Sequence, residues 1–217
     1  MAALDLSIRG KIILTAALAL VLMGGGVVGY HDTGFIAYER GDFNGAVAGL
    51  MRRVKAGDGY AAYLLGDIHE RRDRSSGRVG SRRAADWFKK SARLGLSLGA
   101  LRYAGVLDPE GRSPAICRLD LAVLTNGARA AIPEAQTLLG FRYYSGHCIK
   151  SDRVRATHHF GRAAALADYA GARFKKISGE LGPADRTRLE ALDRQPLVKI
   201  SEAEFLKRFF SLADEMK

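Results

Sequence analysis

Two cysteines and three histidines are the side chains of this sequence that could carry redox or metal chemistry. Cys117 and Cys148 are too few for a disulfide scaffold, and they lack the paired spacing of a zinc site. His147 beside Cys148, and the pair His158-His159, also fit no standard zinc pattern. We therefore expect neither a metal nor a cofactor, and the state of the cysteines depends on the compartment.

No catalytic motif stands out in the chain. It lacks a nucleophile elbow, a phosphate-binding loop and paired carboxylates. The glycine run Gly24-Gly25-Gly26 lies in an apolar segment, without the strand, the lysine and the following helix that a phosphate loop needs. These observations favour a binding protein over an enzyme, and an enzyme acting on cell-wall or other envelope substrates is kept as a third hypothesis.

A dense group of arginines could bind anions. Six of them fall within 13 residues, and Asp73 is the acid among them. Guanidinium groups bind phosphate and carboxylate in a bidentate manner, so the group suits anionic lipid headgroups or an acidic protein. A solvated loop is the alternative interpretation. The group consists of Arg71, Arg72, Arg74, Arg78, Arg82 and Arg83.

An apolar segment near the N-terminus predicts the cellular compartment in which these residues lie. Residues 12–30 carry no charge, and a helix of that length would span about 28 Å, close to the thickness of a bilayer core. Arg9 and Lys11 precede the segment, which predicts a cytoplasmic N-terminus and a periplasmic domain from residue 31 onward, anchored in a bacterial inner membrane. A signal peptide cleaved near 27–29 and a buried soluble helix are the other interpretations. Because the rest of the chain is expected outside the cytoplasm, we expect no nucleic-acid partner, although the net charge is +11.

Two patterns repeat along the exported part. The first is an alanine, three residues, an apolar or small residue and a glycine, at 61–66, 100–105 and 135–140. The second places small and large apolar residues three and four apart, at 46–57, 84–95 and 156–167, which makes one face of a helix. Glycines and prolines fall between the copies. The patterns predict stacked helix pairs.

The predicted fold is all-α. We expect helix pairs at 34–40 with 43–55, 60–71 with 82–94, 97–106 with 115–127, and 133–145 with 153–166, followed by a helix near 168–180. The predicted organisation is a tip and membrane anchor at 1–31, a helical-repeat domain at 32–182, and C-terminal capping helices at 183–217.

The chain resembles the Sel-one-like repeat family, the short α/α relatives of the tetratricopeptide repeat. The matching residues are Leu65-Gly66, Leu139-Gly140 with Tyr143 to Gly146, and the stretch from Ala84 to Gly95. The third pair departs from the pattern because residues 115–127 lack the aromatic couple. The resemblance implies a right-handed α/α solenoid of four to five helix pairs that recruits proteins, with no catalytic residues. The residues expected to pack the repeats are Leu65, Gly66, Ala84, Trp87, Phe88, Ala92, Leu139, Gly140 and Phe160.

The helix map predicts a disulfide. Cys117 begins the helix 115–127, and Cys148 follows the helix 133–145. Consecutive antiparallel helices bring the start of one beside the end of the next, so the cysteines can pair in an oxidising compartment. Two unpaired thiols are the alternative.

The end of the chain predicts one more amphipathic helix. Ser201-Glu202-Ala203-Glu204 resembles a capping box, and an apolar stripe follows from Phe205 to Met216. The helix either caps the open end of the repeat stack or docks a partner. Taken together, the sequence predicts a membrane-anchored periplasmic adaptor that binds proteins through the arginines and the concave side of the stack. The alternative is a structural subunit or assembly factor of a larger inner-membrane complex, which Gly24-Gly25-Gly26 would favour through a close helix contact.

Overall fold

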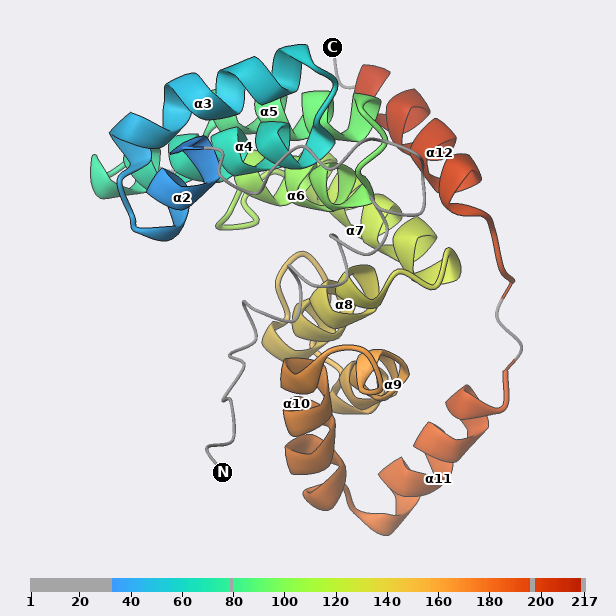
Figure 1. The fold of residues 1–217 in the computed structure, drawn as a ribbon. Coiled ribbons are helices and arrows are strands. Elements are labelled where there is room, and N and C mark those ends of the chain that lie inside the picture. Colours follow the sequence, from blue (N-terminus) through green and yellow to red (C-terminus); the bar gives the residue numbers. More distant parts are fainter. Residues whose placement is uncertain (1–32, 79, 196–197, 216–217) are drawn as a thin grey trace, which may run out of the picture.

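The computed structural model describes residues 33–78, 80–195 and 198–215, and the predicted membrane segment at 12–30 lies outside them. The described residues form helices and loops without a strand, so the all-α prediction is confirmed. With the labels of Figure 1, the helices are α2 (Thr33–Glu39), α3 (Phe43–Lys55), α4 (Gly59–Ser75), α5 (Arg82–Arg93), α6 (Ser97–Leu107), α7 (Pro114–Arg129), α8 (Pro133–Ser145), α9 (Arg153–Ala163), α10 (Asp168–Gly179), α11 (Pro183–Asp193) and α12 (Glu202–Asp214).

Short polar side chains determine where many of the helices begin. The Asp58 carboxylate accepts hydrogen bonds from the backbone N–H groups of Tyr60 and Ala61 at the start of α4. Ser201 accepts from the N–H of Glu204 at 3.1 Å, as the predicted capping box requires at its first residue. These bonds satisfy N–H groups that have no partner inside the helix.

The turns that join one helix pair to the next share a backbone conformation. Each turn has three residues, and the middle residue is left-handed: Gly57 at φ 92°, Gly95 at φ 88° and Ala131 at φ 57°. Glycine adopts this region freely, whereas an alanine pays a steric cost because of its Cβ. The turn before α8 therefore keeps the same backbone conformation, although Ala131 stands where the other two turns have glycine.

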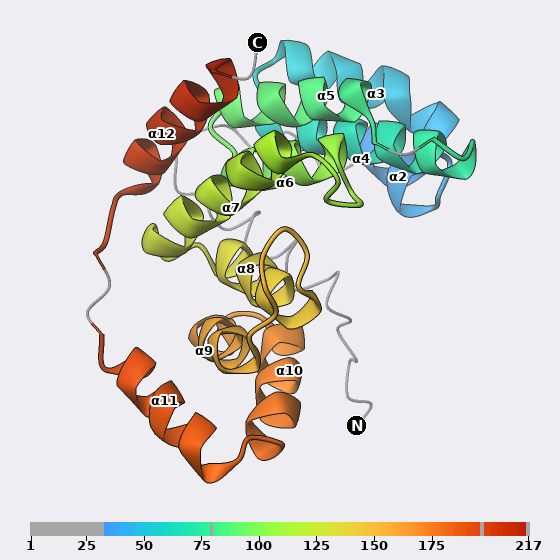
Figure 2. The same cartoon turned by 180° about the vertical axis from the view of Figure 1, so that it is seen from behind.

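The helices stack in pairs along an arc. The second helix of a pair packs against the first helix of its own pair and against the first helix of the next pair, as α5 does with α4 and α6. Figures 1 and 2 show this order from α2 at one end to α10 at the other. The predicted pairs and the helix that follows them are confirmed.

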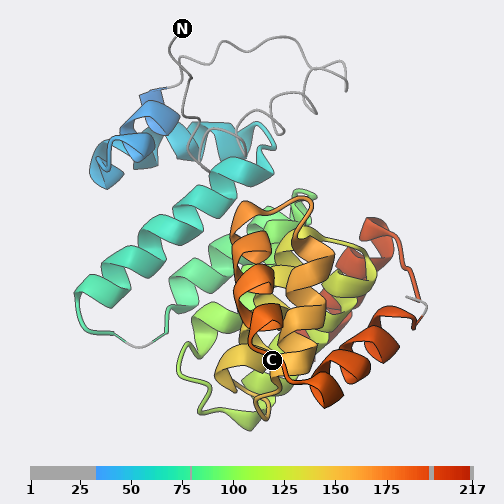
Figure 3. The same ribbon diagram turned by 90° about the horizontal axis from the view of Figure 1, so that it is seen from below.

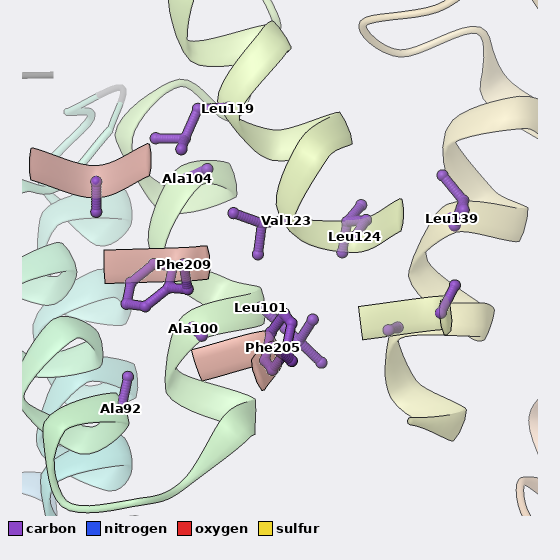
Figure 4. Close-up of a cluster of buried hydrophobic side chains, with 13 residues drawn as sticks. Ala92, Ala100, Leu101, Ala104, Leu119, Val123, Leu124, Leu139, Phe205 and Phe209 are labelled. Atoms are coloured by element: carbon purple, nitrogen blue, oxygen red, sulfur yellow. The ribbon is translucent and has the colours of Figure 1, made fainter. Parts of the chain in front are cut away.

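The core consists of several neighbouring apolar clusters and has no single centre. One cluster joins α3 and α4, another joins α8, α9 and α10, and the largest lies around α6 and α7. Figure 4 shows the largest cluster, in which Phe205 and Phe209 of α12 lie among side chains of α6 and α7. Each cluster is shielded from water by the helices that pack on it, as in other repeat folds.

The two last helices leave the repeat order. α11 packs beside α9, and α12 returns to the middle of the stack, where it contacts α6 and α7. The sequence predicts a cap over the open end of the stack, and the structure instead places α12 against its centre. On the N-terminal side, the 17-residue helix α4 extends away from the C-terminal helices, as Figure 3 shows.

Candidate functional site

A contact between glycine and phenylalanine joins the two helices of a regular pair. A Cβ added at Gly66 of α4 would lie 2.6 Å from Cε1 of Phe88 in α5. One added at Gly140 of α8 would lie 2.9 Å from the Phe160 ring in α9. The two contacts are equivalent in the repeat, and both allow a ring to touch the backbone of the partner helix directly.

The side chains predicted to pack the repeats lie where the pattern places them. Trp87 is half-buried against the α3–α4 cluster, with Lys90 Nζ 5.3 Å from its ring centroid. His159 takes the corresponding place in α9, where its ring stacks on Tyr143. The remaining members are buried: Leu65, Gly66, Ala84, Phe88, Ala92, Leu139, Gly140 and Phe160.

The third pair replaces the aromatic contact with an ion pair. Gly105 of α6 takes the place of Gly66, but an added Cβ would meet Arg142 Nη2 at 3.1 Å and Asp120 Oδ1 at 3.5 Å. Arg142 Nε donates to Asp120 Oδ2 at 2.6 Å, and the Asp120 residue is 2% exposed. The departure from the repeat pattern at residues 115–127 is therefore a buried Asp–Arg pair that links α7 to α8.

Four of the six clustered arginines are already paired within the chain. Asp67 accepts from Arg71, and Glu70 accepts from Arg74 at 2.6 Å. Arg78 pairs with Asp73 at 3.1 Å. The fourth, Arg72, donates to Asn44 Oδ1 at 2.6 Å. Three of these four partners are carboxylates, so the stretch from Arg71 to Arg78 is less positive than its arginine content suggests.

Asp67 is the acceptor of a small hydrogen-bond network at the surface of α4. The Tyr38 hydroxyl donates to it at 2.5 Å, and burial together with the nearby carboxylate raises the pKa of Tyr38 above its ordinary value. The hydrogen bond to Asp67 raises the pKa of Arg71. Arg102 of α6 reaches Glu70 in the same way. Asp67 and Glu70 follow the alanine–glycine pattern of α4, and each lies one helical turn before an arginine. This spacing is the feature of the sequence that could have predicted the two ion pairs.

The other two of the six clustered arginines, Arg82 and Arg83, begin α5 and are exposed. Within the described part of the chain, Arg82 and Arg83 have no ion-pair partner, and Lys90 and Arg93 extend the charge along the helix. Positions 82, 86, 90 and 93 form one stripe at helical spacing, in which Asp86 is the acid. We call Arg82, Arg83, Lys90 and Arg93 the α5 basic face. The last two lie outside the arginine group that the sequence singles out.

The two cysteines are bonded to each other in the structure. Cys117 and Cys148 have Cα atoms 5.1 Å apart, within the usual range for a disulfide. The bond ties the first turn of α7 to the loop after α8, where a Cβ added at Gly111 would lie 2.9 Å from His147 Cε1. Burial and the neighbouring Arg142 lower the pKa of His147.

The histidine pair on α9 has structural partners. His158 Nδ1 lies 2.6 Å from Asp193 Oδ1 of α11, and its other nitrogen accepts from Arg162. His159 Nδ1 lies 2.7 Å from Gln136 Oε1, and burial lowers the pKa of His159 to about 3. His159 is therefore neutral at physiological pH and donates through Nδ1.

The described residues contain neither a metal-binding cluster nor a helix that could span a membrane. Within 33–78, 80–195 and 198–215, no group of three or more histidine, cysteine, aspartate or glutamate side chains could hold a metal ion. Over the same residues, none of the helices combines the length and the apolar composition needed to cross a bilayer.

The paired helices, their glycine–aromatic contacts and their shared turns define the chain as an α/α repeat protein. The Sel1 repeat family model matches residues 59–96 and 133–168. These segments are the α4–α5 and α8–α9 pairs, which carry the Gly66–Phe88 and Gly140–Phe160 contacts. The resemblance to Sel-one-like repeats is thus confirmed for these segments, and the pair with Asp120 lies between them, outside the match.

The solved structures that are similar to the chain include the following two. One is a protective antigen present in uropathogenic Escherichia coli strains and displaying an SLR fold, with a TM-score of 0.48 and 20% identity, over 80% of this chain and 36% of that one. Another is a Sel1 repeat protein from Oxalobacter formigenes, with a TM-score of 0.48 and 18% identity, over 84% of this chain and 70% of that one. The chain thus spans about a third of the antigen's length. No curated protein matches it.

Proposed function

We propose that the protein is a membrane-anchored adaptor of the bacterial envelope, not an enzyme, whose repeat domain binds another protein in the periplasm. Sel1 repeat proteins generally mediate protein–protein interaction. The observation that carries the proposal for this chain is the α5 basic face, a row of exposed cations on a rigid helix of a matched repeat.

The chemistry of this face favours an acidic protein segment. Its cations lie on one helix whose other side is fixed by buried contacts, including Phe88 against Gly66. Because the backbone that carries these cations is already ordered, a carboxylate partner has to immobilise only their side chains. Because the face is solvent-exposed, its attraction should weaken with salt, with a screening length of about 8 Å at physiological ionic strength.

Crosslinking in cells tests the proposal most directly. A photoreactive residue at position 83 should trap a protein partner, which mass spectrometry identifies. Replacing Arg82, Arg83, Lys90 and Arg93 by glutamine should weaken binding to that partner and flatten its salt dependence.

A matched control exists in the self-paired arginines. The variant with Arg71, Arg74 and Arg78 changed to glutamine removes nearly as much charge from groups that already have acidic partners, so we expect a smaller loss of affinity. Equal losses in both variants would show that net charge matters and the α5 basic face does not. If position 83 crosslinks only to lipid and the protein binds anionic vesicles, the α5 basic face binds a membrane surface and not a protein.

The location in the envelope is part of the same proposal. It is supported by the uncharged run at 12–30 with Arg9 and Lys11 before it, and by the Cys117–Cys148 bond, which an oxidising compartment would maintain. An alkaline phosphatase reporter at the C-terminus should be active. A mass measurement with and without reductant should show a difference of two hydrogens, and two free thiols in protein from its native compartment would count against export.

A structural subunit of a larger inner-membrane complex is the second candidate. Gly24-Gly25-Gly26 within the apolar run favours it, since small residues allow close packing of membrane helices. Extraction in mild detergent separates the candidates, because a subunit should copurify with its partners in fixed stoichiometry.

A further inference from the structure

The helix α12 occupies a site on the repeat stack that is not part of the repeat itself. It lies after the last helix pair, yet it packs against α6 and α7 in the middle of the chain. The matched repeat segments end at residue 168, well before it. We call the surface under it the α12 seat and define it by Lys89, Ser97, Leu101, Tyr103, Val123 and Leu124.

The apolar part of the seat accepts three side chains spaced four residues apart. Phe205, Phe209 and Ala213 of α12 are each at most 1% exposed. Figure 4 shows Phe205 beside Leu101, and the Phe209 ring meets Tyr103 edge-on with centroids 5.5 Å apart. The seat therefore fits a helix with aromatic residues at i and i+4 and a small residue at i+8.

The polar part of the seat recognises both ends of the helix. Ser97 donates a hydrogen bond to Glu202 in the first turn. Lys89 Nζ lies 2.9 Å from Asp214 Oδ1 and 3.5 Å from the Ala213 carbonyl oxygen in the last turn. Lys89 is only 9% exposed, and a buried ammonium group requires a carboxylate partner. The seat is thus specific for a helix of about 13 residues that carries an acid at each end.

The connection of α12 to the repeats is narrow. α11 packs beside α9, and residues 194–201 separate it from α12. From the described part of that connection, the Ile200 N–H donates to the Arg129 carbonyl oxygen. α12 is thus attached to the domain as a ligand on a short tether would be.

We propose that the α12 seat is a binding site for an amphipathic acidic helix of a partner protein, and that α12 fills it while no partner is bound. The partner helix carries aromatic residues at i and i+4, a small residue at i+8, and a carboxylate in its first and last turns. The inference deepens the proposed function, on which it rests for the protein-binding role, by stating the chemistry of one partner segment. The tethered helix α12 competes for the seat at an effective concentration in the millimolar range. A partner helix must therefore bind the seat more tightly than α12 does, or bind when the contacts of α12 have been weakened.

The test uses the full chain and a fluorescein-labelled peptide of residues 199–215 as the probe. Fluorescence anisotropy should show weak binding to the unmodified protein. The variant Phe205→Ala/Phe209→Ala should bind the peptide at least tenfold more tightly, because its own helix no longer fills the seat. Adding Lys89→Met to that variant should lower the affinity about tenfold. A peptide with both phenylalanines replaced by alanine should not bind.

A milder variant keeps the test valid if the phenylalanine variant does not fold. Glu202→Gln/Asp214→Asn removes the negative charge from the two end contacts and keeps the apolar ones, so α12 should fill the seat less tightly and the protein should bind the peptide several-fold more tightly than the unmodified protein does. Glu204→Gln is the matched control, since Glu204 pairs with Arg208 within α12 and should leave binding unchanged.

Three results would overturn the proposal. The first is a folded phenylalanine variant, by circular dichroism, that does not bind the peptide. The second is a Glu202→Gln/Asp214→Asn protein that binds no better than the Glu204→Gln control. The third is a dimer of the unmodified protein, by light scattering, that the phenylalanine variant abolishes, because a second copy would then fill the seat. None of these depends on the α5 basic face, so the crosslinking test can fail or succeed independently.

Discussion

The substitution Gly66→Ala tests the contact that joins a repeat pair. The added Cβ would lie 2.6 Å from Cε1 of Phe88, whereas an ordinary contact is 3.4–4 Å. The gap is short by about 0.8 Å, and the ring lies in a fully buried position between two packed helices. Either α4 and α5 move apart or Phe88 leaves its place, and both changes disturb close packing.

Two effects of opposite sign determine the size of the change. Overpacking in a core costs about 1–3 kcal/mol, and here the upper part of that range applies because the clash is with a rigid ring. An alanine inside a helix is favoured over glycine by about 1 kcal/mol. The free energy of unfolding should therefore fall by about 1–2 kcal/mol.

Urea unfolding followed by circular dichroism measures this quantity. Gly171→Ala in α10 is the matched control, because its Cβ would have its nearest neighbour at an ordinary 3.4 Å, so the helix preference should raise stability by about 0.5–1 kcal/mol. Combining Gly66→Ala with Phe88→Leu should cost less than the sum of the two changes. If Gly66→Ala were as stabilising as Gly171→Ala, the reasoning about this contact would be refuted.

Three further changes test other features. Ala131→Gly should stabilise the protein by about 0.5–1 kcal/mol in the same assay, because a left-handed conformation costs an L-residue about 1–2 kcal/mol, and an unchanged or lower stability would contradict this. Asp120→Asn should cost about 3 kcal/mol by leaving Arg142 without its carboxylate, while the double change Asp120→Leu/Arg142→Met should cost less. The low pKa of His159 means that the unfolded chain binds its proton first, so stability should be constant above pH 6.5 and fall below it, by about 2 kcal/mol at pH 5. His159→Phe should remove that part of the pH dependence, and an identical acid profile would show that the histidine is not its source.

The helices and their order could be predicted because their signals are local. Apolar and small residues three and four apart mark the buried face of each helix, and glycines mark the turns. The cysteine pairing follows from the same map, since it joins the ends of two consecutive helices. Even the irregular third pair was visible as a missing aromatic couple.

Contacts between residues far apart in the sequence could not be predicted in this way. A missing phenylalanine does not reveal that Asp120 will pair with Arg142, because that pairing depends on how α7 and α8 meet. The amphipathic stripe of α12 shows that one face is buried, but any apolar surface of the stack would satisfy it. The arginine group was visible from composition, and the pairing of Arg71 and Arg74 could be read from their i,i+4 spacing, whereas the contact of Arg72 with Asn44 depends on how α3 and α4 meet.

The return of α12 has a consequence for how the chain is made. Residues 202–214 leave the ribosome after all the described helix pairs, yet they cover Leu101 and Val123 in the middle of the stack. Synthesis therefore completes every helix pair before the middle of the stack is shielded from water. A chain truncated shortly before residue 202 would contain every described helix pair and leave apolar side chains of α6 and α7 exposed to water, where chaperones and proteases can bind them.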